Sequence, residues 1–339
     1  MPVTIKDLAR ESGVSPSTVS YVLNGGPRSV SEDTRKRVME ARDRLNFHPN
    51  SAARSLSRRK VDTIGVVYNY AHTDDVNDYF TTILHGIMGA CLSYQQNTML
   101  LTTHEWSDIA QHIGTYCDGR VDGLLVIAPP DNLGIIESLQ RGNKPWVLVG
   151  DWPPNPLASC IDVDNRGASK SATEYLISMG HSRIAYFAGD DNQRSTVERE
   201  QGYRLAMEEA GLFVSGSSVV AGRYNPSSGA ERARTLLQLP RNEWPDAIAC
   251  GNDGIAFGVL SVLVANGVRV PEDISVMGFD DVASAALAPV PLTTVHQPFR
   301  EIGCRAAEIV VQNVNGGDIA VRELLPTHLV ERASVGKRA

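Results

Sequence analysis

The stretch that decides the fold is residues 4–24, which read Thr-Ile-Lys-Asp-Leu-Ala-Arg-Glu-Ser-Gly-Val-Ser-Pro-Ser-Thr-Val-Ser-Tyr-Val-Leu-Asn. Ile5, Leu8 and Ala9 recur at the spacing of one helical face, and Thr4 stands where a helix cap is expected. Gly13 then permits a sharp turn. The spacing therefore predicts a short helix that ends in a tight turn.

A second helix follows this turn. Ser15 offers a capping oxygen, and Pro16 occupies the first helical position, where its missing N–H costs nothing. Val19, Val22 and Leu23 point inward. The outer face near the helix start is left to Pro16, Ser17, Ser20 and Tyr21, as in a recognition helix that meets base edges.

A third helix and the local charge complete this module. Ser31 opens the helix, with Glu32 and Asp33 in its positive first turn. Residues 1–60 carry 12 Lys and Arg against 6 Asp and Glu, a formal charge of +6 in a chain of −7. A generic three-helix bundle would not need this asymmetry, whereas a phosphate-binding domain does. The basic module therefore predicts DNA binding.

Composition sets the broad class of the chain. Its 339 residues are 42% hydrophobic, which suits two or three globular domains. There is no apolar run of signal-peptide or membrane-spanning length, which favours the cytoplasm. The cysteines are odd in number and widely spaced, as expected of reduced thiols, and they suggest neither a disulfide nor a metal site. They are Cys91, Cys117, Cys160, Cys250 and Cys304.

From residue 61 onward, apolar strands alternate with helices. The first series has strands at 63–68, 98–103, 121–128 and 146–149, with helices at 79–94, 109–117 and 135–139. The second has helices at 166–179, 196–210, 227–239 and 254–265, with strands at 183–188, near Val219, at 247–250 and at 275–279. A strand at 291–295 leads to a last helix at 299–314. The pattern predicts two doubly wound parallel sheets with a cleft between them.

The module at 4–24, with Val30-Ser-Glu-Asp-Thr-Arg-Lys-Arg-Val38 and Asn50-Ser-Ala-Ala-Arg-Ser-Leu56, resembles the headpiece of the lactose-repressor/galactose-repressor (LacI/GalR) family of bacterial transcription regulators. The resemblance implies that the second helix reads the major groove. It also implies a hinge helix that enters the minor groove and inserts a leucine, which kinks the duplex.

The resemblance assigns DNA contacts residue by residue. The variable base-reading positions are Pro16, Ser17 and Tyr21. Because Pro16 has no side-chain hydrogen bond to offer, base reading depends on Ser17 and Tyr21, with Arg28 or Ser29 in the loop. Phosphate contacts fall to Ser15, Thr18, Ser20, Asn24 and Asn50, and Thr4 is included among the DNA-binding residues. Leu56 is the expected wedge, with Ala53 beside it. The alternative is that Leu56 packs on the domain that follows.

The rest of the chain resembles the effector domain of the same family, which is similar to periplasmic sugar-binding proteins. The matching motifs are Val121-Asp-Gly-Leu-Leu125, Gly180-His-Ser-Arg-Ile184, Gly202-Tyr203, Asn252-Asp253, Gly278-Phe-Asp-Asp281 and Pro291-Leu-Thr-Thr294. The implied fold is an all-α helix-turn-helix headpiece (1–49), a hinge and linker (50–60) and an α/β two-lobed periplasmic-binding-protein-like (type I) domain (61–339). Lobe 1 spans about 61–162 plus 292–325, and lobe 2 about 163–291 plus 326–339.

The same resemblance implies an effector site in the cleft. It assigns effector contacts to Asp151, Arg199, Asn252 and Asp280, with Tyr224 as an aromatic platform; Tyr79, Phe80, Trp106 and Trp152 are further candidates. Each has a structural alternative. Asp280 and Asp281 could cap a helix or a turn, Arg199 could pair with Glu198 or Glu200, and the tryptophans could pack under loops.

Acid and amide contacts favour a saccharide, whose hydroxyls they pair with. Many relatives carry an Asn-Pro-Phe-Phe motif where residues 69–80 of this chain form a longer segment, so a purine or nucleoside effector stays open.

Three other classes explain less. An enzyme would need a nucleophile elbow, a phosphate loop or a metal motif, and none occurs. A solute-binding protein leaves the headpiece unexplained, and a DNA-packing protein leaves the cleft unexplained. The sequence therefore predicts a ligand-controlled regulator without a cofactor. It acts as a homodimer on a palindromic operator, and its architecture serves induction and co-repression equally.

Overall fold

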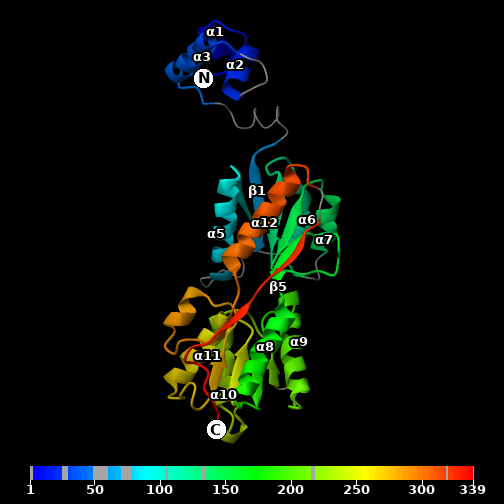
Figure 1. The fold of residues 1–339 in the computed structure, drawn as a ribbon, viewed down its shortest axis with the longest axis vertical. Helices are drawn as coiled ribbons and strands as arrows, with labels where there is room; N and C mark the ends of the chain where they lie inside the picture. The colour runs from blue at the N-terminus through cyan, green and yellow to red at the C-terminus, as the bar shows by residue number, and fades with distance from the viewer. Residues whose placement is uncertain are drawn as a thin grey trace. The chain divides into compact units, whose positions relative to one another are not determined.

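The computed structural model describes residues 3–24, 30–48, 60–69, 78–103, 106–130, 134–214, 218–317 and 320–338. The chain forms two compact units, Met1–Val61 and Asp62–Ala339, and each is described by itself. Figure 1 shows short helices in the first unit and two layered lobes in the second.

In its described residues, the first unit is a helical headpiece that contains α1 (Ile5–Ser12), α2 (Pro16–Asn24) and α3 (Glu32–Arg44). Thr4 and Asp7 form a capping box at the start of α1, and Gly13 ends it at φ 67°, a left-handed conformation that suits glycine. Ser31 caps α3. The small core consists of Leu8, Ala9, Val19, Val22, Val38 and Phe47.

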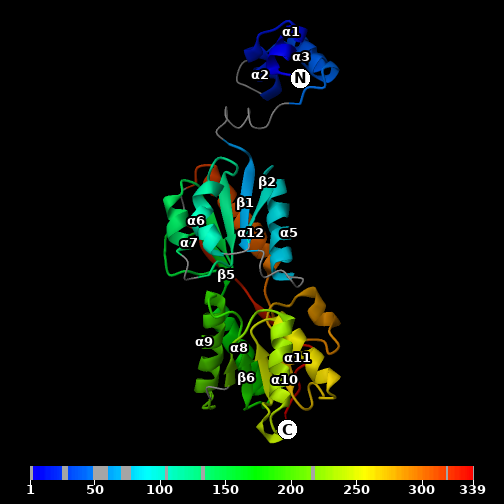
Figure 2. The ribbon, with the colours of Figure 1, turned by 180° about the vertical axis from the view of Figure 1, so that it is seen from behind.

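The first lobe of the second unit is built on a six-stranded sheet in the order β11-β5-β4-β3-β1-β2. Its paired strands all run parallel. In chain order they are β1 (Thr63–Asn69), β2 (Asn97–Thr103), β3 (Gly123–Ile127), β4 (Trp146–Val149), β5 (Cys160–Val163) and β11 (Arg322–Leu325). Helices α5 (Asp78–Ser93) and α12 (Phe299–Val314) cover one face, while α6 (Trp106–Tyr116) and α7 (Ile135–Arg141) cover the other, as Figures 1 and 2 show from opposite sides.

The second lobe has a four-stranded parallel sheet in the order β7-β6-β8-β9. The strands are β6 (Ile184–Phe187), β7 (Val219–Val220), β8 (Ala247–Cys250) and β9 (Ser275–Met277). Helices α8 (Asn165–Ser178) and α9 (Arg194–Glu209) pack together on one face, and α10 (Pro226–Leu237) and α11 (Asp253–Ala265) on the other. Short 3-10 turns, η4 (Arg241–Glu243) and η5 (Ala283–Leu287), complete the lobe.

The chain passes between the lobes more than once. It leaves lobe 1 after β5 and enters α8, and it returns through β10 (Thr294–His296) to α12. After β11 it leaves lobe 1 again through β12 (His328–Val330), which pairs antiparallel with β10. Lobe 1 is therefore discontinuous in sequence, because α12 and β11 are supplied by a late part of the chain.

Candidate nucleic-acid interface and ligand cleft

The start of α2 presents a small polar surface in the headpiece. Ser15 and Ser17 are exposed, and so is Pro16 between them, while Thr18, Ser20 and Tyr21 are half-buried. The Ser15 hydroxyl accepts the Thr18 backbone N–H at 3.1 Å and lies 2.7 Å from the Ser17 hydroxyl. This cap fixes the direction of α2 and leaves short side chains at its positive end, where DNA phosphates are attracted.

Thr4 is exposed, but its polar atoms are already engaged. Its backbone N–H and its hydroxyl both donate to the Asp7 carboxylate, at 3.0 and 2.7 Å. Its visible role is therefore to cap α1. Arg28, Ser29, Asn50, Ala53 and Leu56 lie outside the described residues, and so does the side chain of Asn24.

The second unit contains a cavity of about 170 Å³ lined by residues from both lobes. One water occupies about 30 Å³ of liquid, so the space suits a small molecule. Of the candidates from sequence, six line it: Tyr79, Trp106, Arg199, Tyr224, Asn252 and Asp280. Lobe 1 contributes the first two, and lobe 2 contributes the other four.

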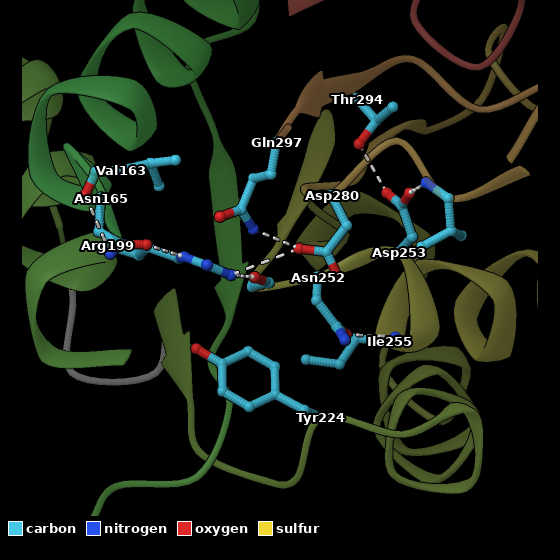
Figure 3. A network of polar contacts seen from close by, with 12 residues as sticks. Val163, Asn165, Arg199, Tyr224, Asn252, Asp253, Ile255, Asp280, Thr294 and Gln297 are labelled. Carbon is cyan, nitrogen blue, oxygen red and sulfur yellow. Dashed lines mark hydrogen bonds and ion pairs between the residues drawn. The ribbon is translucent and has the colours of Figure 1, made fainter. Parts of the chain in front are cut away.

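Arg199 is the central cation of this cleft. Its Nε donates to Asn165 Oδ1 at 2.8 Å, and its Nη1 donates to the Gly251 carbonyl at 2.7 Å. Nη1 also lies 3.9 Å from an Asp280 oxygen. The guanidinium is 4.0 Å from the centre of the Phe279 ring. Figure 3 shows Arg199 extending from Asn165 toward Asp280. The alternative pairing with Glu198 or Glu200 is not what holds Arg199, since its hydrogen bonds go to Asn165 and Gly251 and Glu200 pairs with Arg204.

Asp280 follows β9 in an unusual backbone conformation, with φ 137°. Its N–H donates to the Val295 carbonyl, and its side chain accepts Gln297 Nε2 at 2.7 Å. Burial raises the pKa of the Asp280 carboxyl well above its ordinary value, with the neighbouring Asp253 adding to this, while Arg199 opposes it. A strained residue with a buried carboxylate in a cleft is typical of a functional position.

Tyr224 stands where an aromatic platform was expected. Its hydroxyl accepts from Thr196 at 2.8 Å, and its ring lies 5.8 Å from the Arg199 guanidinium. The ring fills the space in which a side chain at Gly189 would stand, so only glycine fits there. The backbone at Gly189 therefore packs directly against the Tyr224 ring, and Tyr224 also lines the cavity.

Asp162 is a lining residue that the sequence did not reveal. It lies inside β5, is buried, and accepts the Val163 N–H at 2.8 Å and Asn165 Nδ2 at 3.0 Å. Burial raises the pKa of its carboxyl to about 7. The half-buried Tyr79 has its phenol pKa raised by the loss of solvent around the ring and then by the Asp162 charge.

Three candidates do not line the cavity, for identifiable reasons. Asp151 is buried, and its carboxylate receives Arg194 Nε at 3.2 Å, so it joins β4 to the start of α9. Phe80 stacks on Tyr68 with 3.7 Å between ring centres. Trp152 lies 4.3 Å from the Arg322 guanidinium. Ion pairing and packing account for all three.

The remaining lining residues were not among the named candidates, although Asn69 begins the segment 69–80 that was expected to face the ligand. They are Tyr68, Asn69, Ile127, Ala128, Gly150, Asp162, Asp190, Gln193, Ser195, Arg223, Asn225 and Gln297. Several follow the carboxyl ends of parallel strands, where ligands collect in open sheets. That rule would have found Asn69, Ala128 and Asp190 once the strand ends were known.

Two further observations concern membrane-spanning helices and metal ligands in the described part of the chain. No helix within it is both long and apolar enough to cross a membrane. Within the same residues, no group of three or more His, Cys, Asp or Glu side chains is placed to hold a metal ion.

Family comparisons agree with the two-unit architecture. Residues 4–50 match the model described as "Bacterial regulatory proteins, lacI family", and residues 173–335 match a periplasmic binding protein-like domain. The chain is similar to the HTH-type transcriptional repressor PurR of Haemophilus influenzae (strain PittEE), at 34% identity over 94% of each protein. The PurR of Aliivibrio fischeri (strain ATCC 700601 / ES114) is 33% identical over 99% of each.

Solved structures give the same result. A complex of the transcriptional regulator CelR with cellobiose has 33% identity and a TM-score of 0.75, covering 98% of this chain and 99% of that one. The Lac repressor dimer bound to operator and the anti-inducer ONPF has 26% identity and a TM-score of 0.88, covering 99% of this chain and 100% of that one. With its helix-turn-helix headpiece and two-lobed body, the chain belongs to the LacI/GalR family of bacterial transcription regulators.

Proposed function

We propose that this protein is a cytoplasmic transcriptional repressor whose affinity for its operator is controlled by a sugar bound between the two lobes. The observation that carries this is the presence in one chain of a basic helix-turn-helix headpiece and a polar cleft with aromatic walls. A regulator uses both, whereas an enzyme or a solute-binding protein would use only the cleft.

In this proposal the headpiece reads the operator through α2. Pro16, Ser17 and Tyr21 meet base edges, with Arg28 or Ser29 beside them, while Ser15, Thr18, Ser20, Asn24 and Asn50 contact phosphates. Leu56, next to Ala53, is the minor-groove wedge. The exposed, short side chains around the capped start of α2 support the first assignment, and the printed name of the PurR relatives supports repression.

A saccharide suits the chemistry of the cleft. Carboxylates (Asp162, Asp280) and amides (Asn252, Gln297) pair with hydroxyl groups, and the Tyr224 ring offers a flat surface to the apolar face of a pyranose. A site built this way rejects analogues that lack the matching hydroxyls, since its buried polar groups would stay unpaired. The similarity to the CelR–cellobiose complex supports the same ligand class.

The homodimer has a candidate surface, here called the apolar flank. In lobe 1 it consists of Met88, Leu92, Tyr94 and Leu100, which are 43–78% exposed, and in lobe 2 of Val264 and Leu287, at 43% and 85%. The two parts meet where Ser284 donates to Asp78 at 3.3 Å. Large exposed apolar side chains gathered on one flank mark an interaction site.

The switch is a two-state coupling. Two headpieces read the half-sites of a roughly palindromic operator, and the hinges fold in the kinked minor groove. An effector in the cleft changes the lobe arrangement and hence the spacing of the hinges. It does so only by binding the two arrangements with different affinity.

A purine or nucleoside effector is the second candidate. The identity of 33–34% to repressors named PurR over nearly the whole chain favours it. A purine could lie against Tyr224 and bind Asp280 through its ring N–H groups.

One experiment tests these proposals together. The full-length protein is titrated into a palindromic duplex, chosen by selection from a random pool, and fluorescence anisotropy is followed with each sugar or purine of a panel. We expect tight binding that weakens steeply with salt, and a shift of affinity with one sugar. A shift with a purine alone would replace the sugar by the second candidate. Binding without sequence preference would contradict the regulator itself.

A further inference from the structure

Two buried carboxylates reach the cavity from opposite lobes. Asp162 lies on β5 in the sheet of lobe 1, just before the chain crosses into lobe 2. Asp280 follows β9 in the sheet of lobe 2. Both side chains are about 95% buried, and both line the cleft. A charged residue inside a buried parallel strand is costly, so Asp162 calls for a functional explanation.

The protein leaves acceptor capacity on both carboxylates. An ionised carboxylate offers roughly four lone-pair sites. Asp162 receives the Val163 N–H on one oxygen and Asn165 Nδ2 on the other. Asp280 receives Gln297 Nε2 at 2.7 Å and has a second side-chain hydrogen bond with Asn252. Since Asp162 and Asp280 both line the cavity, their remaining lone pairs can accept hydrogen bonds from the O–H or N–H groups of a ligand.

The cations of the cleft do not balance an added negative charge. Arg199 is committed to Asn165, to the Gly251 carbonyl and, at 3.9 Å, to Asp280. Arg223, the other lining cation, is exposed to solvent, where its charge is screened. An anionic ligand would thus meet three carboxyl groups, Asp162, Asp190 and Asp280, against two guanidiniums, of which Arg199 already donates to two protein oxygens. Because burial already raises the pKa of Asp162 and of Asp280, a nearby anion would disfavour their ionised forms further.

We propose that the cleft selects an uncharged ligand with donor groups on two edges, one held by Asp162 of lobe 1 and the other by Asp280 of lobe 2. Asp162 is the residue that determines this preference. The inference rests on the proposed function and deepens it, since it excludes phosphorylated sugars and sugar acids. It also explains how one ligand senses both lobes: its two edges are bound by different sheets.

A structural role is the competing explanation for Asp162. Because it holds Asn165, which in turn accepts from Arg199, it could act only by positioning Arg199. The two explanations differ in what they predict for ligand charge. A positioning role lowers the affinity for every ligand alike, whereas a selecting role changes the ratio between neutral and anionic ligands.

The test uses matched ligand pairs with full-length protein. The pairs are glucose and its phosphate ester, cellobiose and cellobionate, and inosine and its monophosphate. Affinities are measured by calorimetry for the wild type, for Asp162→Asn and for Asp162→Ser, which keeps an acceptor. Asp122→Asn is the control, because Asp122 is a buried lobe 1 carboxylate just before β3, at the amino ends of the parallel strands, where it is bonded to the Asp62 N–H at 2.7 Å and does not line the cavity.

We expect the wild type to bind a neutral member and to bind its charged partner at least 10-fold more weakly. Asp162→Asn should lower the affinity for the neutral ligand by about 10- to 100-fold, as expected for the loss of a charge-assisted hydrogen bond. The ratio of the affinities for the neutral and the charged member should become smaller. Preference for a charged member, or a ratio unchanged in Asp162→Asn, would overturn the inference. A neutral purine as the bound ligand would overturn only the sugar assignment.

A second measurement needs no ligand. Burial raises the pKa of Asp162 to about 7 from an ordinary 3.8. The folded protein therefore holds this proton more tightly than the unfolded chain, and the free energy of unfolding is highest below about pH 4 and falls as the pH rises to about 7. The charged groups that act on Asp162 are Arg199, which opposes the shift, and Glu198 and Asp151, which add to it. Urea unfolding from pH 4 to 8 should show a smaller fall for Asp162→Asn than for the wild type. An equal decrease of the unfolding free energy in both proteins would show that Asp162 is not a buried carboxyl group and would overturn the inference, even if no ligand of the panel binds.

Discussion

At the scale of single residues, Arg199 joins three separate segments of lobe 2 to the helix that carries it. From α9 it reaches Asn165 at the start of α8, the carbonyl of Gly251 after β8, and Asp280 after β9. The side chain is 7% exposed, so each of these partners is shielded from water. A group that satisfies several buried polar atoms at once cannot be removed without leaving them unpaired.

We therefore expect Arg199→Ala to lower the free energy of unfolding by about 3–5 kcal/mol and to abolish the ligand response. Arg204→Ala is the matched control on the same helix, because Arg204 forms a partly exposed ion pair with Glu200. Its cost should stay within about 1 kcal/mol. Urea unfolding followed by circular dichroism measures both variants, and equal costs would show that the Arg199 contacts are not formed in solution.

Asp246 has the opposite pH behaviour to Asp162. Its carboxylate accepts the backbone N–H groups of Ser182 and Arg183 and lies 3.4 Å from Arg338. Burial alone would raise its pKa, but these hydrogen bonds and charges together lower it below 3.8. Its contribution to stability is therefore present above pH 3.8 and is lost as the pH falls below that value.

For Asp246→Asn we expect a loss of about 1–3 kcal/mol at pH 7 that shrinks below pH 3.8. The measurement is urea unfolding of both proteins at a series of pH values between 3 and 7. A loss that does not change with pH would mean that the charge of Asp246 is irrelevant to the lobe 2 fold.

At the scale of helices and strands, local patterns predicted most elements, including α9 with Arg199 and β9 before Asp280, and missed β5, which carries Asp162. The apolar runs at 63–68 and 247–250 are present as β1 and β8, and the helix predicted at 299–314 has the bounds of α12. Strand β5 was missed because Asp162 interrupts its short apolar pattern, Cys-Ile-Asp-Val. Asp280 was identified through the family motif, whereas Gln297 had no local signal, since its role depends on a contact 17 residues away.

The headpiece helices depend on a very small core. Leu8 and Val19 are fully buried there, and Phe47 closes the core after α3. Leu8→Ala leaves a cavity that typically costs about 2–5 kcal/mol, a large fraction of what so small a unit can supply. We expect hydrogen exchange in α1 to accelerate strongly and DNA binding to be lost.

The effector unit should be unaffected by this change. Its thermal transition and its ligand response should match the wild type, because the headpiece has its own core. Arg10→Ala, an exposed change in α1, is the control for DNA binding and exchange. Slow exchange in α1 of the Leu8→Ala protein would show that other contacts hold the headpiece together.

At the scale of the whole molecule, the apolar flank predicts how copies associate. Leu92 is 78% exposed on α5, and Leu287 is 85% exposed on η5. We expect Leu92→Asp and Leu287→Asp each to shift a dimer toward monomer in sedimentation velocity and to weaken operator binding, because a palindrome needs two headpieces. Phe213→Asp changes an equally exposed apolar residue outside the flank and should leave the dimer intact. Dissociation by Phe213→Asp alone would place the interface elsewhere.

The discontinuity of lobe 1 has a consequence for the order in which a growing chain can fold. The headpiece core is complete by Phe47, so it can form early in synthesis. Lobe 1, by contrast, needs Phe299, Ile302 and other α12 residues for its core, and β5 has no neighbour on its outer side until β11 emerges at residues 322–325. All of lobe 2 up to β9 is therefore translated while lobe 1 waits. The segment that completes lobe 2, with Ser334 bonded to Val276 and Val335 in the lobe 2 core, emerges only after β11. On the ribosome, lobe 1 therefore stays incomplete until residue 325, and lobe 2 is completed after it.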